Sequence, residues 1–135
     1  MKKGDDLIKK LNLIPHPEGG HFSETYRHNN EVSHIYYLLK KNEFSHWHKL
    51  NKNEILNFYD GDPLKVFLSN KKEKTKEIIL GNNTKNNEIY HYVVKAGTWF
   101  SMQSLGEFSL IGCIVVPAFN YSDFELAPKN WSPLK

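Results

Sequence analysis

Two histidines and a glutamate form the strongest chemical pattern in this sequence. His46, His48 and Glu54, with Gly61 after them, have the spacing H-x-H-x5-E-x6-G. Residues two apart in a strand point to the same face. The spacing therefore predicts that His46 and His48 lie side by side and that Glu54 returns opposite them on the next strand. Such a trio could bind a first-row divalent metal, exchange protons near neutral pH, or simply form a buried His48–Glu54 hydrogen bond.

A second group of candidate residues surrounds the segment 15–20, Pro-His-Pro-Glu-Gly-Gly. Its prolines and glycines restrict the backbone path, so it could hold Glu18 at a pocket mouth or serve only as a connector. Arg27 follows it and is the only arginine among 18 basic residues. Its planar guanidinium suits an anionic ligand or a carboxylate. An internal ion pair with Glu24 or Glu54 is the alternative.

Aromatic side chains are the expected pocket walls. Trp99, which follows the turn at residues 95–97, and Tyr37 are expected to contact a ligand, although large aromatic side chains also build cores. The single cysteine, Cys113, lies in the apolar run 110–116. That position favours a buried small hydrophobic residue over a nucleophile.

Strands must position most of these side chains. Leu7, Ile8 and Leu11 share one face of an expected short helix at residues 4–12, which Pro15 ends. Short alternating runs bounded by turn residues predict ten strands, at 21–27, 33–39, 44–48, 54–59, 64–68, 78–80, 89–94, 98–102, 108–116 and 124–126. No long helix could form a parallel crossover, so the sequence predicts antiparallel sheets in a sandwich or barrel.

Composition limits the classes of partner. The 135 residues fit one domain, residues 1–135, and 39% hydrophobic with 24% charged residues is typical of a folded chain. The net charge of +3 is small, and the densest basic run, at 71–77, is broken by glutamates, so we expect no nucleic-acid partner. No apolar stretch is long enough to cross a membrane. No apolar run follows the basic start of the chain, which predicts a cytoplasmic protein without a signal peptide.

Seven short motifs resemble, in the same order, those of small cupin-like bacterial and fungal proteins of unknown function. They are His-Pro-Glu-Gly-Gly, Glu-Thr-Tyr-Arg, Trp-His-Lys, Phe-Tyr-x-Gly-x-Pro-Leu, Ala-Gly-x-Trp, Gly-Cys-x-Val-x-Pro-x-Phe and Asp-Phe-Glu-Leu-Ala, between Leu11 and Ala127. The resemblance implies an all-β double-stranded β-helix, which is a jelly-roll or cupin barrel. It also implies a pocket inside the barrel and commonly a homodimer, but no particular reaction.

Two departures from the resemblance concern metal and proton transfer. Metal-binding cupins have another histidine in a second motif, but residues 98–103 contain none, and Ser101 or Gln103 would be a weak substitute ligand. Similar proteins often have a histidine where this chain has Asn57, which can hydrogen-bond a ligand but cannot shuttle protons. The sequence therefore predicts no tightly bound metal cofactor, with a weakly bound divalent metal at the two histidines and the glutamate as the alternative.

Three functions are compatible with these residues, and each would act on a small polar metabolite. The first is a metal-independent epimerase or isomerase of a sugar or sugar nucleotide, by fold analogy with the dTDP-4-dehydrorhamnose 3,5-epimerases. In it His48 and Glu54 would be catalytic. The second is a ligand-binding module without catalysis, and the third is a metal-dependent enzyme. The expected ligand-binding residues are Glu18, Arg27, Tyr37, Asn57 and Trp99.

Overall fold

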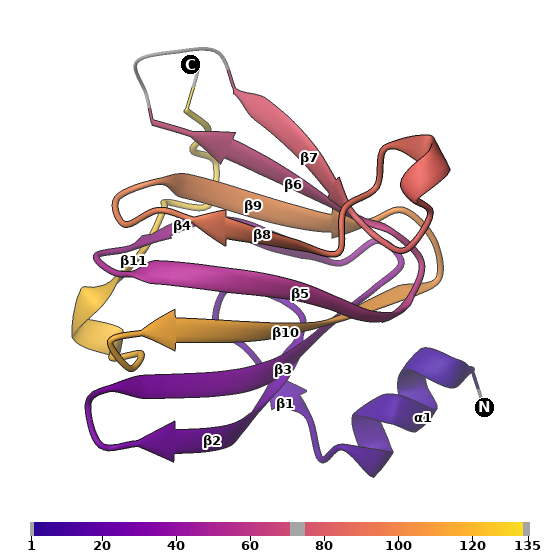
Figure 1. The fold of residues 1–135 in the computed structure, drawn as a ribbon, viewed down its shortest axis with the longest axis horizontal. Helices are drawn as coiled ribbons and strands as arrows, with labels where there is room; N and C mark the ends of the chain where they lie inside the picture. The colour runs from indigo at the N-terminus through magenta and orange to yellow at the C-terminus, as the bar shows by residue number, and fades with distance from the viewer. Residues whose placement is uncertain (1, 71–74, 134–135) are drawn as a thin grey trace.

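The computed structural model describes residues 2–70 and 75–133, and strands dominate them (Figure 1). Helix α1 (Lys3–Lys10) comes first. The strands are β1 (Ile14–Pro15), β2 (His21–His28), β3 (Val32–Lys40), β4 (Phe44–Leu50), β5 (Asn53–Gly61), β6 (Leu64–Ser69), β7 (Lys76–Leu80), β8 (His91–Val94), β9 (Trp99–Ser104), β10 (Phe108–Val116) and β11 (Phe124–Leu126). Two short 3-10 helices, η1 (Thr84–Asn86) and η2 (Tyr121–Asp123), lie between strands.

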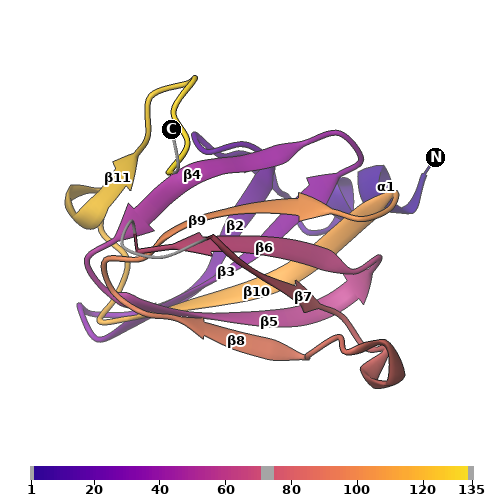
Figure 2. The same cartoon turned by 90° about the horizontal axis from the view of Figure 1, so that it is seen from above.

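The strands form two sheets that face each other as a jelly-roll barrel. One sheet has the order β1-β2-β3-β10-β5-β8 and the other has the order β11-β4-β9-β6-β7. Strands β4, β9 and β6 run over β3, β10 and β5 in Figure 2. Every paired strand in both sheets is antiparallel to its neighbour. The predicted all-β barrel of antiparallel sheets with a short N-terminal helix is therefore confirmed.

Helix α1 packs against the outer face of the first sheet, toward the end of the barrel that lies away from η2 (Figure 1). Acidic residues occupy its first turn and basic residues its last turn, as the helix dipole favours. Leu7 and Ile8 pack against a small cluster that includes Leu38 and Phe108. Because Gly4 lies against the Phe108 side chain, the helix sits close to β10.

The main core lies between the two sheets. Its buried members alternate along their strands and include Leu39, Leu56, Val66, Phe100, Met102 and Ile111. Cys113 is buried in the same cluster, as expected for a small hydrophobic residue. None of the helices in the described residues is long and apolar enough to cross a membrane.

The segment 117–126, which contains η2 and β11, crosses the other end of the barrel (Figure 1). We call it the strap. Lys52 Nζ anchors it by donating to the Ala118 carbonyl at 2.7 Å and by pairing with Asp123 at 2.6 Å. The Phe119 amide donates to Ser33 Oγ at 2.8 Å. The strap is therefore attached to both sheets, and it forms the roof of the space beneath it.

Candidate functional site

A cavity of about 350 Å³ lies beneath the strap. Its polar and titratable lining comes from β2, β4, β5, β10, the loop before β2 and the strap: His16, Glu18, Glu24, Arg27, His48, Glu54, Cys113, Asn120 and Tyr121. Its apolar lining includes Phe22, Ile35, Leu50, Phe119 and Phe124. A ligand in this cavity would meet polar groups at the base and apolar groups along the walls, which is typical of small-molecule sites.

A bulge in β4 aims His48 into the cavity. The pairing of β4 with β9 shifts register between Ser45 and His48, so both of these residues are buried on the inner face although they are three apart. His48 Nδ1 lies 2.6 Å from the His46 carbonyl oxygen. Because a carbonyl can only accept, Nδ1 carries the proton, and the neutral imidazole presents the lone pair of Nε2.

The surroundings of His48 favour that neutral form. Burial lowers the pKa of His48, and the nearby Glu54 carboxylate opposes this only in part. The Phe100 ring packs against the imidazole with 4.1 Å between centroids. His48 is therefore an unprotonated base near neutral pH.

Glu18 lies directly in front of that base. Its Oε2 is 3.4 Å from His48 Nε2 and accepts a hydrogen bond from Ser45 Oγ. Burial raises the pKa of Glu18, with His16 acting against the shift. A protonated Glu18 and a neutral His48 can therefore share one proton between Oε2 and Nε2.

The loop at residues 15–20 holds Glu18 in place by close backbone contacts. Gly19 has φ +113°, and a Cβ there would overlap the Phe44 carbonyl, so only glycine fits. The Tyr37 hydroxyl donates to the Gly19 carbonyl at 2.5 Å, and the His46 amide donates to the Glu18 carbonyl at 2.8 Å. The loop is thus an integral part of the site rather than a plain connector.

Glu54 is the second buried carboxyl of the site. Burial raises its pKa to about 7, and His48 acts against the shift. Burial also raises the pKa of its neighbour Cys113 well above the usual thiol range, so the thiol stays protonated. Glu54 therefore exchanges its proton close to neutral pH.

His16 adds a second imidazole that the sequence analysis did not single out as a site residue. The Glu18 amide donates to His16 Nδ1 at 3.1 Å, which places the proton of the neutral ring on Nε2. Burial lowers the pKa of His16. Its ring packs edge-on against Phe22 at 4.6 Å, so His16 is fixed as a neutral donor in the cavity wall.

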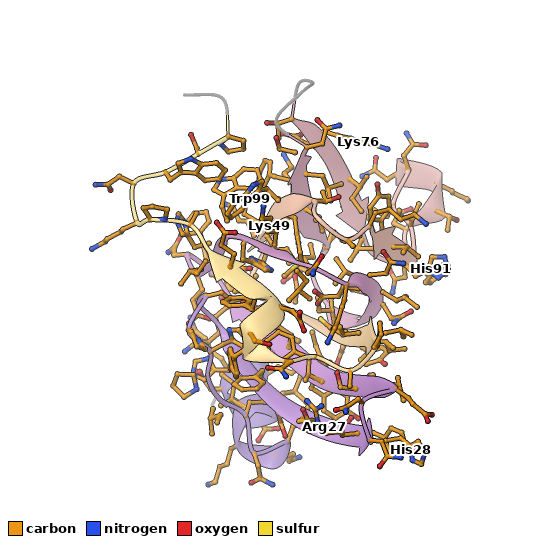
Figure 3. All side chains as sticks on the ribbon, turned by 90° about the vertical axis from the view of Figure 1, so that its left-hand side faces the viewer. Arg27, His28, Lys49, Lys76, His91 and Trp99 are labelled. Carbon is orange, nitrogen blue, oxygen red and sulfur yellow. The ribbon has the colours of Figure 1, made fainter. Side chains whose placement is uncertain are left out.

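Arg27 lies at the rim and already has protein partners. Its Nε and Nη2 donate to the two carboxylate oxygens of Glu24 at 3.0 and 3.1 Å, and Nη2 also donates to the Phe119 carbonyl at 2.8 Å. Figure 3 looks onto this end of the barrel, with Arg27 below the strap. The predicted ion pair with Glu24 is confirmed, and Arg27 also lines the cavity.

His46 does not lie beside His48, contrary to the expectation from strand alternation. The bulge leaves both His46 and Trp47 on the outer face of β4. His46 Nε2 donates to the Pro128 carbonyl at 2.9 Å, and Trp47 packs against Trp131. The first histidine of the pattern therefore holds the C-terminal segment and is not part of the cavity lining.

Tyr37, Asn57 and Trp99, which the sequence predicted as ligand contacts, lie outside the lining of this cavity. Tyr37 is buried behind the loop that carries Glu18. Asn57 is three residues after Glu54 in β5 and faces the other side of the sheet, where its amide donates to the Gly112 carbonyl at 3.4 Å.

Trp99 packs outside the barrel. Its ring lies 4.6 Å from the Trp131 ring, and Lys49 Nζ lies 5.0 Å from its centroid. In Figure 3, Trp99 and Lys49 appear together on the opposite side of the strap from Arg27. The aromatic walls come instead from Phe22 and from the strap.

The donor set does not fit the metal site that the pattern implied. Among the described residues, no group of three His, Cys, Asp or Glu side chains is arranged to hold a metal ion. His46 faces outward. Ser101 and Gln103 alternate with the buried core residues Phe100 and Met102, so they face away from the barrel interior.

Residues 5–127 match the family described as cupin superfamily (DUF985). The chain belongs to this family. This cupin is 33% identical to a protein of known structure from Shewanella oneidensis, with a TM-score of 0.88 over 94% of this chain and 85% of that one. It is 28% identical to a hypothetical protein from Leishmania major, with a TM-score of 0.87 over 93% of this chain and 88% of that one. The expected membership of the cupin superfamily is thus confirmed.

More distant cupins share the fold alone. Oxalate decarboxylase from Bacillus subtilis is 14% identical, with a TM-score of 0.68 over 83% of this chain and 29% of that one. None of the curated proteins matches this chain.

Proposed function

We propose that this cupin binds a small polar metabolite, a sugar or sugar nucleotide, and exchanges a proton with it without a metal. The observation that carries the proposal is the environment of His48: a buried imidazole with its Nδ1 proton held by the His46 carbonyl and its Nε2 facing the cavity. Two buried carboxyls, Glu18 and Glu54, lie beside it. Groups with pKa values displaced in opposite directions are typical of acid–base pairs.

The chemistry that these groups support is proton transfer at a carbon next to a carbonyl. His48 Nε2 removes the carbon-bound proton and becomes an imidazolium. A protonated Glu18 or Glu54 donates a hydrogen bond to the carbonyl oxygen, where negative charge develops. Return of a proton to the opposite face of the same carbon completes an epimerisation, whereas its return to the former carbonyl carbon completes an isomerisation.

The test is deuterium exchange. A panel of keto sugars and nucleotide-linked keto sugars is incubated with the protein in D2O, and proton NMR follows loss of the signal from the carbon next to the carbonyl. We expect exchange with at least one member and a loss of about 100-fold or more in His48→Gln. His46→Gln is the matched control, because it changes a histidine two residues away that lies outside the cavity lining.

The same experiment separates the other functions. Exchange that a chelator abolishes and a divalent metal restores, with His46→Gln impaired as well, would establish a metal-dependent enzyme. Binding of panel members without exchange would establish a ligand-binding module. Exchange that persists undiminished in His48→Gln would remove His48 from the base role.

A further inference from the structure

Glu24 and Arg27 reach the cavity because β2 has a bulge of its own. The register between β2 and β3 shifts between Glu24 and Tyr26. Residues three apart in a regular strand would face opposite sides. The bulge instead places both Glu24 and Arg27 in the cavity lining, where their side chains can pair.

This pairing uses most of the hydrogen-bonding capacity of the guanidinium. Nε and one Nη2 proton bond Glu24, and the second Nη2 proton bonds the Phe119 carbonyl. The hydrogen bonds of Arg27 with the described residues leave only Nη1 for a ligand. The Glu24 carboxylate also cancels the charge of Arg27 and repels an approaching anion.

No other permanent cation lines the cavity in the described part of the chain. The two lining imidazoles, His16 and His48, are neutral because burial lowers their pKa values. The other titratable groups at the bottom of the cavity are the Glu18 and Glu54 carboxyls and the Cys113 thiol. A buried anion would therefore find no positive partner and would pay a large desolvation cost.

An uncharged hydroxylated ring meets a suitable surface. The carboxyls and imidazoles that line the bottom of the cavity can donate hydrogen bonds to the hydroxyl and carbonyl groups of a ligand, or accept them from its hydroxyl groups. Phe119, Tyr121 and Phe124 pack edge-to-face above them, with 4.9 to 6.0 Å between ring centroids. Such rings can stack on the apolar face of a sugar.

We propose that the cavity selects uncharged sugar rings over rings that carry a carboxylate or phosphate, and that Glu24 sets this preference by neutralising Arg27. This inference takes its ligand class from the proposed function and adds a selectivity to it. Any phosphate of a nucleotide-linked ligand stays in solvent, beyond the Glu24–Arg27 pair at the rim. Glu24 acts as a specificity-determining residue rather than as a catalytic one.

Paired probes test the preference by ligand-detected NMR titration. D-glucose, D-galactose, D-mannose and D-fructose are each titrated against their 6-phosphates, and glucose is titrated against glucuronate. We expect the wild type to bind the neutral member of at least one pair about tenfold more tightly. Glu24→Gln should shift the ratio about tenfold toward the anion, and Arg27→Gln added to it should abolish that shift. Glu31→Gln, on the same hairpin and exposed, is the charge-matched control.

Each other result counts against the proposal. Equal or tighter binding of the anion by the wild type overturns it, and so does an unchanged ratio in Glu24→Gln. Binding of no probe overturns the ligand class itself. A neutral preference without deuterium exchange would refute the proton-transfer function and leave this inference standing, whereas exchange with an anion preference would do the reverse.

Discussion

His48 and Glu54 show how burial alone can prepare an acid–base pair. The same loss of water disfavours the imidazolium of one and the carboxylate of the other, so the pKa of His48 falls and that of Glu54 rises above it. The hydrogen bond from Nδ1 to the His46 carbonyl then decides which nitrogen is the base. Neither effect needs a metal: the first follows from burial and the second from one backbone contact.

Glu54→Gln tests this burial through stability. The folded protein holds the Glu54 proton up to about pH 7, whereas an ordinary glutamate releases it near 4.5. Between these two pH values the folded state binds a proton that the unfolded state has released. The free energy of unfolding of the wild type therefore falls relative to that of Glu54→Gln as pH rises, by up to about 3 kcal/mol. Above about pH 7 the difference between the two proteins is constant. Urea unfolding at pH steps from 4 to about 8 measures it.

Titration of the groups that do not interact with Glu54 is the same in both proteins, so it cancels in this comparison. Glu125→Gln, a change at an exposed carboxylate, is the control and should leave a flat difference. A flat difference for Glu54→Gln as well would show that Glu54 ionises normally in the folded protein.

At the scale of elements, glycines shape the turns on which the strands depend. Gly61 ends β5 with φ +90°, and a Cβ there would overlap the carbonyl oxygen of Phe108 in β10. Gly97 has a similar φ of +83°, but its Cβ would meet nothing within 4 Å. Comparing substitutions at Gly61 and Gly97 therefore separates the cost of backbone strain from the cost of steric overlap.

Gly61→Val should destabilise the protein by about 3 kcal/mol or more, and Gly97→Val by about 1–2 kcal/mol, because only the first adds an overlap to the strain. Denaturant midpoints with unchanged m-values measure both free energies of unfolding. If the two variants unfold at the same midpoint, the close approach of Gly61 to β10 is not rigid.

Strands were predictable from the sequence, but the bulges within them were not. Alternation and turn residues are local signals, and the ten predicted strands correspond to β2 through β11. The extra residues in β2 and β4 leave the apolar pattern almost unchanged. Beyond each bulge, however, every residue of the strand faces the side opposite to the one that simple alternation predicts. Glu18, Arg27, His48 and Glu54 were thus placed correctly in the cavity lining, whereas His46 was not.

The remaining site residues depend on long-range contacts. His16 stands between two prolines, where no periodicity indicates what it faces. Phe119 and Phe124 reach the cavity because Lys52, Ser33 and the pairing of β11 with β4 hold the strap across the barrel end. Trp99 was expected in the wall because large aromatics line pockets and cores alike. Its contact with Trp131 places it on the outer face of the barrel instead.

At the scale of the whole molecule, β2 is largely an open edge. Strand β1 pairs only with His21 and Phe22, so the rest of β2 has no strand partner on that side among the described residues. Open edges are commonly covered by a second chain. We expect a homodimer in which the region Phe22–Arg27 is packed or exchanged.

Light scattering at micromolar concentration should give twice the mass of one chain. Tyr26→Lys, which puts a charge on β2 at a side chain that is 56% exposed, should shift the equilibrium toward monomer. Tyr90→Lys changes a tyrosine that is 58% exposed elsewhere and should leave the mass unchanged. A monomeric wild type would refute the homodimer, and equal effects of both variants would place the interface elsewhere.

The bulge in β4 has a practical consequence for anyone who prepares this protein. Its outward residues hold the C-terminal segment: His46 bonds the Pro128 carbonyl, and the Ala127 amide donates to the Trp47 carbonyl at 3.0 Å. The next residue, His48, donates its Nδ1 proton to the carbonyl of His46. A tag that disturbs these contacts would also disturb the strand that positions His48, so we place a purification tag on the N-terminal side, next to α1.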